Sequence, residues 1–370
     1  SGELLYYQAI TAQLGLEWEK SRLYQHRLIE LNRQANNFGG LAAALFNSAH
    51  VASFIGQHEE AILFAEELVQ YVAANITEDD AYLLHVYRTM LLDCYTMGGQ
   101  YEAAEKVVAQ LLPWLTAEEE GRAAISGWSA VGTYHFYRQN LEASYYAHSR
   151  AITLAEKIGS ASSSPFLCHA EVAALTNRLP EAQTSFSKAT ERIDLQHSGS
   201  NITFYYYVYY LLSRDVQHLN AARDNMLALV NHLHDPHLRH DYLHRMPLHA
   251  DIAALWEAQA FTRVQVPLAR LDAPLGRPLT NNDRIEVVWT VDAGELDTAV
   301  HQQSGKVAQR RCRLQRLAAE ARAQGAAPTH ADLAQALGVN VRTIERDSAA
   351  LETAGTPLFT RRVQTKQAPE

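Results

Sequence analysis

A pattern that recurs about every 40 residues limits this chain more than any other feature. Acidic or amide residues followed by alanine begin the copies at Glu60, Glu102, Glu142, Glu181 and Asn220. The spacings are 42, 40, 39 and 39 residues, and an earlier copy places Glu19 41 residues before Glu60. Apolar residues between these positions follow helical spacing. Two helices per copy cannot bury their apolar faces alone, so the copies are expected to stack.

The pattern also indicates how the two helices of a copy pack. A small residue near the start of the second helix lets the first helix cross it closely. The turn before the second helix is expected at Gly56, Gly98 or Asn177, or at an equivalent polar residue. The sequence therefore predicts a helical repeat domain over residues 1–262.

These copies resemble the tetratricopeptide repeat, although they are longer than its usual roughly 34 residues. Lengthened repeats of this kind are similar to the superhelical sensor domains of MalT-like regulators and bacterial signalling ATPases. The resemblance covers residues 3–260 and implies a mainly α fold, a TPR-like α-α superhelix (solenoid). An unrelated helical repeat is the alternative, and it would hardly change the class of function.

Charge divides the chain into an acidic body and a basic end. The net charge is −9, yet residues 304–370 hold 11 Lys and Arg against 6 Asp and Glu. One end can therefore approach a polyanion that the other end would repel. The three cysteines lie far apart, which excludes a disulfide framework and fits a reducing cytoplasm. No apolar run is long enough to span a membrane.

The repeats are expected to bind an effector in a concave groove. The stretch "TFYYYVYYLLSR" offers Tyr206, Tyr207 and Tyr210 to a peptide, a small molecule or a partner protein. Packing between repeats is the other reading, and it is favoured for most of these tyrosines. A histidine-rich stretch places His240 and His244 four residues apart, but no further ligand completes a metal site, and we expect no metal.

Repeat spacing stops near Gln259. Residues 263–303 are predicted to be a Pro-rich linker with a short strand over 284–292. That strand needs a partner, and we expect it to pair with the chain end near 357–365.

Three helices are predicted after Val307. Thr329 and Asn340 are expected to cap the second and third helices, and Gly338 to end the second. In a helix-turn-helix the third helix would expose Arg342, Thr343 and Arg346, which suits contacts to DNA bases and phosphates. A wing over 356–366 would bring Arg361 and Arg362 to the phosphates. The candidate DNA-binding residues are Thr329, Asn340, Arg342, Thr343, Arg346, Arg361 and Arg362.

The stretch "LAQALGVNVRTIERDSAAL" closely resembles the winged helix-turn-helix of DeoR-type bacterial repressors. Gly338, Thr343, Ile344, Arg346 and Asp347 match the usual pattern. Glu345 replaces a residue that is often basic, which lowers the expected DNA affinity, and Ser348 replaces a frequent leucine. The resemblance covers residues 310–365 at most and implies a DNA-binding domain over 304–370. Winged helices also serve as protein-docking domains, which is the alternative.

These features predict a cytoplasmic bacterial transcriptional regulator whose repeats sense an effector and whose C-terminal domain binds double-stranded DNA. A homodimer is expected, because such domains often read paired half-sites. No phosphate loop, dinucleotide fingerprint or nucleophile elbow occurs, so we expect neither an enzyme nor a cofactor. A non-catalytic scaffold is the alternative. The chain begins with Ser1 and Gly2 rather than methionine, which suggests the C-terminal part of a larger signalling ATPase.

Overall fold

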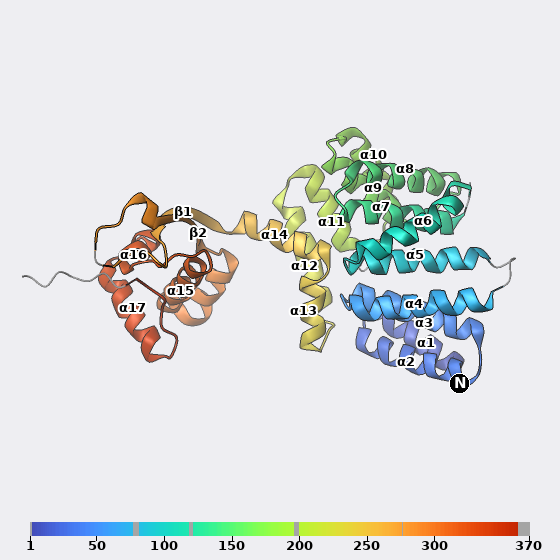
Figure 1. The fold of residues 1–370 in the computed structure, drawn as a ribbon, viewed down its shortest axis with the longest axis horizontal. Helices are drawn as coiled ribbons and strands as arrows, with labels where there is room; N and C mark the ends of the chain where they lie inside the picture. The colour runs from blue at the N-terminus through green and yellow to red at the C-terminus, as the bar shows by residue number, and fades with distance from the viewer. Residues whose placement is uncertain (1, 77–80, 118–120, 196–199, 276, 362–370) are drawn as a thin grey trace, which may run out of the picture. The chain divides into compact units, whose positions relative to one another are not determined.

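Most of the described chain is helical. A computed structural model describes residues 2–76, 81–117, 121–195, 200–275 and 277–361, which hold 17 α-helices and a two-stranded sheet (Figure 1). They belong to two compact units, Ser1–Trp256 and Glu257–Glu370. The prediction of a mainly α protein is confirmed. Over the described ranges no helix is long and apolar enough to cross a membrane.

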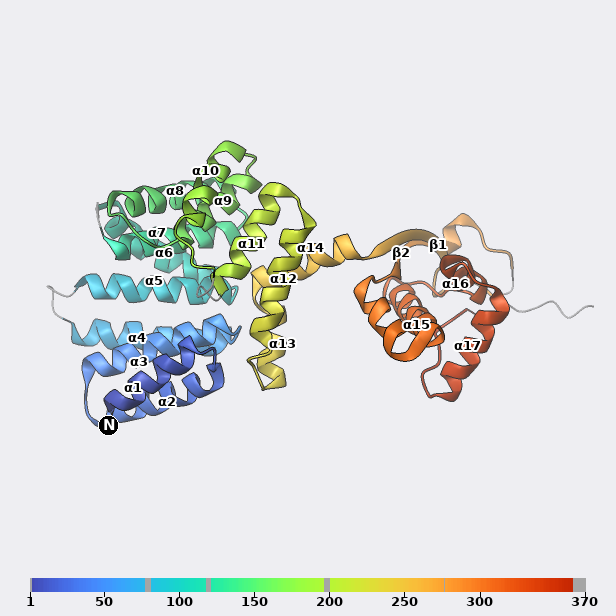
Figure 2. The ribbon, with the colours of Figure 1, turned by 180° about the vertical axis from the view of Figure 1, so that it is seen from behind.

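The first unit is built from helices that pack side by side (Figures 1 and 2). The helices are α1 (Gly2–Leu14), α2 (Trp18–Gln34), α3 (Phe38–Phe54), α4 (His58–Asn75), α5 (Ala81–Met97), α6 (Tyr101–Ala117), α7 (Arg122–Tyr137), α8 (Leu141–Lys157), α9 (Ser164–Leu175), α10 (Leu179–Thr190), α11 (Ser200–Ser213), α12 (Val216–Val230), α13 (Pro236–His244) and α14 (Pro247–Ala260). Consecutive helices from α1 to α12 contact each other, and so do alternate helices from α3 to α11. The odd-numbered helices α3 to α11 therefore form one continuous layer.

One buried small side chain recurs near the start of the second helix of each pair. These residues are Ser21, Ala61, Ala104, Ser144, Ala182 and Ala222, all at 0% exposure. In three copies the buried residue lies one position after the alanine that the sequence pattern marks. The hydroxyl of Ser21 donates to the carbonyl of Ala9 at 3.1 Å, and that of Ser144 to Gly132 at 2.8 Å. A side chain this close to a neighbouring backbone explains why the position stays small.

The turn before each second helix has its own backbone signature. The residue two positions before the helix adopts a positive φ at Leu16, Gly56, Gly99, Gln139, Asn177 and Arg214. Gly56 and Asn177 are the predicted positions, whereas Gly99 rather than Gly98 has the left-handed conformation. At Gly56 a Cβ atom would lie 2.7 Å from the carbonyl oxygen of Asp241, so the helix-pair turn also makes a close tertiary contact.

Helix α13 joins residues far apart in sequence. Glu19 accepts hydrogen bonds from the backbone of His234 and Asp235 at 2.7 and 2.8 Å. Nε2 of Gln57 donates to Asp241 at 2.5 Å. A shared apolar cluster includes Trp18, Val51, Ile55, Leu233, Leu238 and Tyr242. The late helices of the first unit are therefore packed against its early ones.

The second unit combines a β-hairpin with three helices. Strand β1 (Thr262–Ala269) pairs antiparallel with β2 (Arg284–Asp292), from Thr262 opposite Asp292 to Ala269 opposite Arg284. The hairpin is followed by α15 (Glu295–Ala323), α16 (His330–Leu337) and α17 (Val341–Thr353). Gly305 interrupts α15 with a φ of 80°. Val287 and Trp289 of β2 share a core with Leu314, Leu333 and Ile344 of the helices.

Two predictions for this unit are wrong. Residues 263–303 are not a linker, because both strands and the start of α15 lie there, and Leu268, Val287 and Trp289 are buried. Strand β2 pairs with β1 and not with the chain end. The alternation of apolar residues in "TRVQVPLA" is interrupted by Pro267, which concealed β1 as a strand.

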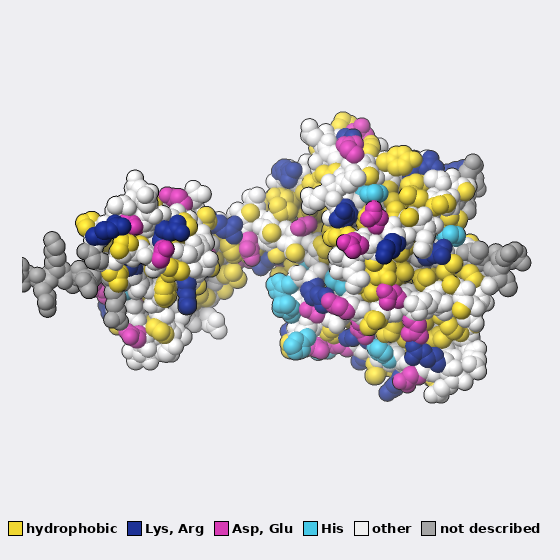
Figure 3. Space-filling view, in the orientation of Figure 1, with side chains coloured by type: hydrophobic (Ala, Val, Ile, Leu, Met, Phe, Trp, Pro, Cys, Tyr) yellow, Lys and Arg dark blue, Asp and Glu magenta, His cyan; other side chains and the backbone are white. Residues whose placement is uncertain are grey.

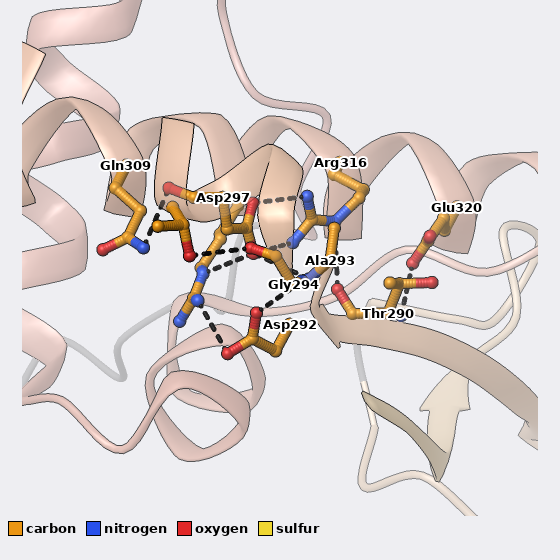
Figure 4. Close-up of polar contacts among 10 residues, drawn as sticks. Thr290, Asp292, Ala293, Gly294, Asp297, Gln309, Arg316 and Glu320 are labelled. Carbon is orange, nitrogen blue, oxygen red and sulfur yellow. Dashed lines mark hydrogen bonds and ion pairs between the residues drawn. The ribbon is translucent and has the colours of Figure 1, made fainter. Parts of the chain in front are cut away.

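A buried carboxylate ties the hairpin to α15 (Figure 4). Asp297 accepts from the backbone N–H of Ala293 at 2.9 Å, from Nε of Arg313 at 2.7 Å and from the guanidinium of Arg316 at 2.8 Å. Burial alone would raise the pKa of Asp297, but these donors outweigh it and lower the pKa to about 2. The carboxylate is therefore ionised at neutral pH and fixes the first segment of α15 against the second.

Candidate functional sites

Helices α16 and α17 are joined by a three-residue turn. Thr329 caps α16, since its hydroxyl accepts from the N–H of Asp332 at 3.2 Å and donates to the Asp332 carboxylate at 2.7 Å. Gly338 ends the helix with a left-handed φ of 62°. Oδ1 of Asn340 accepts from the N–H of Arg342 at 2.9 Å and starts α17. The predicted capping and turn residues are confirmed.

The first two turns of α17 expose two arginines. Arg342, Glu345 and Arg346 are exposed, while Thr343 is half-buried and Ile344 is fully buried. Within the described ranges neither guanidinium has a carboxylate partner. Lys and Arg side chains are visible at several places on the second unit in Figure 3. This face of α17 therefore presents two positive charges one turn apart, with one negative charge between them.

An ion-pair network sets the orientation of α17. Asp347 is fully buried and accepts from Nε of Arg310 at 2.6 Å and Nε of Arg311 at 3.2 Å, both from α15. Burial would raise the pKa of Asp347, but the two arginines outweigh it and hold the pKa below its usual value. Asp347 lies about 100° around the helix from Arg346, so this network fixes the buried side of α17 while Arg346 stays exposed.

The remaining candidate DNA-binding residues are placed differently. The hydroxyl of Thr329 is engaged in its cap. Arg361 donates to the backbone carbonyls of Ala273 and Pro274 at 3.0 and 2.5 Å, and therefore holds the chain end against the loop after β1. Residues 356–361 form no strand, and Arg362 lies outside the described residues. Of the predicted set, Arg342 and Arg346 come together on one exposed face, and Thr343 is half-buried beside them.

The three candidate groove tyrosines lie on α11. Tyr207 and Tyr210 are 5% and 4% exposed, and Tyr206 is half-buried. None of them lines the cavity described next, although Phe204 of the same helix does. Packing between helices is therefore the role that their burial supports.

A cavity of about 260 Å³ opens within the first unit. Its walls come from α3, α5, α7, α8, α9, α11 and α14, so it lies along the layer of odd-numbered helices. Phe54, Met97, Phe136 and Phe204 supply apolar and aromatic surface. Such a concave, mainly apolar site with a few polar groups is typical of small-molecule binding.

Carboxyl groups line this cavity without any arginine or lysine. Glu171 is half-buried in its wall, and Asp251 is exposed at its edge. Burial, with a smaller contribution from the charge of Asp251, raises the pKa of Glu171 to about 8. The charge of Asp93 lies close enough to raise the pKa of Cys168, which lines the cavity. Burial raises the pKa of Asp93 itself to about 7. Within the described ranges none of the three carboxyl groups forms an ion pair. The hydroxyls of Tyr137 and Tyr207 lie close enough to Glu171 and Asp251 for their charges to raise the pKa of both tyrosines.

Two histidines add neutral polar groups to the wall. His148 is 2% exposed, burial lowers its pKa to about 3, and its Nδ1 atom has no partner among the described residues. His249 is also buried, and its Nδ1 lies 2.6 Å from the carbonyl oxygen of Tyr242. Nδ1 of His148 is therefore a polar atom still available for a hydrogen bond.

The sequence interpretation missed this cavity. Glu171 stands in "LCHAEVAAL", where it is the only acid in a helix whose other residues are mostly small or apolar. A carboxyl on such a buried helix needs a partner or a cavity, and this was the available signal.

The histidine-rich stretch lies on and around α13, where histidine side chains gather in Figure 3. The rings of His240 and His244 are 4.7 Å apart between centroids. No group of three potential ligands surrounds them in the part of the chain that the structure describes.

Comparison with known proteins concerns the second unit. A family model described as "Protein of unknown function (DUF1670)" matches residues 255–365. This range holds the hairpin and the helices α15 to α17. No curated protein matches the chain.

Proposed function

We propose that this protein is a bacterial transcriptional regulator. In this proposal the first unit is a TPR-like superhelical array that senses an effector, and the second unit is a DNA-binding domain. The second unit would be a variant of the winged helix-turn-helix, in which the β-hairpin precedes the helices instead of following α17.

The exposed face of α17 carries the proposal. Arg342 and Arg346 have no carboxylate partner among the described residues, and both lie near the start of a helix that follows a three-residue turn. Arginine can donate two hydrogen bonds to guanine O6 and N7 in the major groove, and a helix of this kind fits that groove. Glu345 on the same face can accept from the amino group of cytosine.

The basic composition of the C-terminal part supports the same conclusion. Residues 304–370 carry 11 Lys and Arg against 6 Asp and Glu, whereas the rest of the chain is acidic. Two of these arginines are engaged with Asp347 and two with Asp297, so the charge available to phosphates is smaller than the count suggests. We therefore expect moderate affinity for random duplex DNA.

A salt series tests the proposal. Fluorescence anisotropy of the full chain with labelled random duplex DNA is expected to give an affinity that falls steeply with salt. The logarithm of the binding constant should fall by about 0.9 per phosphate contact for each tenfold rise in salt concentration. On random duplex DNA both arginines are expected to contact phosphates, so removing them is expected to reduce this slope by about 2. Absence of binding at low salt would instead favour the docking scaffold, and isolation of protein partners would follow.

A further inference from the structure

We propose that the cavity of the first unit binds a small organic cation, an ammonium group on a short apolar or aromatic body, with Glu171 and Asp251 as its anionic partners. This deepens the proposed function, on which it rests only for the view that ligand binding in the first unit serves as a signal. The inference draws on the walls, the charges and the size of the cavity.

The walls suit an apolar body and a positive charge together. Phe54, Phe136, Tyr137 and Phe204 come from three odd-numbered helices and line one space. The faces of aromatic rings attract cations, with a larger effect where water is excluded. Met97 supplies a further flexible apolar surface. A neutral apolar ligand would use these walls but leave the carboxyl groups without a partner.

The charges of the cavity select the sign of the ligand. Glu171 on α9 and Asp251 on α14 line the same space, and the charge of Asp251 adds to the cost of ionising Glu171. Among the described residues no lysine or arginine lines the cavity to offset them. An ammonium group placed between the two carboxylates would stabilise both, whereas an anion would be repelled. His148, which is buried and whose Nδ1 has no partner among the described residues, lines the same cavity.

The size of the cavity limits the ligand to a small molecule. Its volume of about 260 Å³ exceeds by more than tenfold the roughly 10–15 Å³ that hold one water. It lies just below the roughly 300–1,000 Å³ that are usual for drug-sized ligands. Because Asp251 at the edge is exposed, a ligand can enter without opening the core.

Calorimetric titration of the full chain, without DNA, tests the proposal. The probes are phenethylammonium, butylammonium and choline, with neutral 2-phenylethanol and anionic phenylacetate as matched compounds. At least one ammonium ion is expected to bind with a Kd below about 1 mM. Phenylethanol and phenylacetate are expected to bind at least tenfold more weakly than phenethylammonium.

Variants then assign the site. Glu171→Gln is expected to weaken the binding of the ammonium ion at least tenfold. Asp251→Asn, at the accessible edge of the cavity, is expected to weaken it about threefold. Glu105→Gln, an exposed carboxylate on α6, is the matched control and is expected to change nothing. If the Glu171→Gln variant did not fold, the binding of the ammonium ion by Asp251→Asn alone would test the site.

The proposal is overturned if no ammonium ion binds, if the alcohol binds as tightly as the amine, or if neither cavity variant weakens binding. These results are separate from the salt series with DNA. Ammonium binding without DNA binding would keep this proposal and reject the regulator, and the reverse outcome would do the opposite.

Discussion

In the second unit Asp297 and Asp347 are each held by two arginines, whereas Asp93 and Glu171 in the first unit have no arginine or lysine beside them among the residues that the structure describes. The first pair is ionised and has lowered pKa values, and the second pair has raised ones. Burial acts on all four in the same direction. The neighbouring cations therefore decide whether burial raises or lowers the pKa of a carboxyl group.

Removal of Asp347 tests the structural side of this comparison most strongly. Asp347→Ala leaves Arg310 and Arg311 without their anion and is expected to lower the free energy of unfolding of the second unit by about 3 kcal/mol. This loss is measured by unfolding in denaturant, with hydrogen exchange of α15 and α17 as the probe. Asp272→Ala removes an exposed carboxylate of the same unit as a control. Equal stability of the two variants would show that the network does not hold α17.

The pH dependence of the first unit tests the other side. With its raised pKa, Glu171 binds a proton in the folded state between pH 4.5 and about 8, whereas the unfolded chain releases it. The contribution of Glu171 to the stability of the first unit is therefore greatest at the acidic end of this window and falls as pH rises, by on the order of 1 kcal/mol per pH unit. Glu171→Gln is expected to flatten that slope, measured by thermal unfolding at pH 5 and pH 8. An unchanged slope would show that Glu171 is paired in solution.

Asp297 is expected to make the stability of the second unit depend on pH in the opposite direction and to a smaller extent. Its folded pKa of about 2 lies below the ordinary 3.8, so its contribution is present above pH 3.8 and is lost as pH falls toward 2. The loss is expected to be about 2 kcal/mol. Hydrogen exchange around Ala293 and Arg316 at pH 4 and pH 2.5 measures it. If protection from exchange did not decrease at pH 2.5, the ionised carboxylate of Asp297 would not stabilise the second unit.

The sequence predicted the parts of the fold that depend on local chemistry. The 40-residue spacing located the helix pairs, and Thr329, Gly338 and Asn340 marked the ends of α16 and α17, because caps and turns are local. Strand β1 was not predicted. Pro267 interrupts its apolar alternation, so the strand is defined by its partner, which lies about 20 residues later. The contacts of α13 with Glu19 and Gln57 join residues too distant for any local pattern.

The candidate sites divide in the same way. Arg342 and Arg346 could be predicted, since helical spacing alone places them on one face. Arg361 could not, because its role depends on the carbonyls of Ala273 and Pro274, nearly 90 residues earlier. The cavity could not be predicted either, because Glu171 on α9 and Asp251 on α14 line the same space only after distant helices have packed.

DNA binding by matched variants tests the central claim most directly. At one low salt concentration, the anisotropy of labelled duplex DNA would be compared for the intact chain, for Arg342→Ala/Arg346→Ala and for Arg284→Ala/Lys306→Ala. The last variant removes the same charge from β2 and α15 of the same unit. We expect the α17 variant to lose binding at least tenfold more than the control. Equal losses, or no binding by the intact chain, would contradict a role for α17 in DNA recognition.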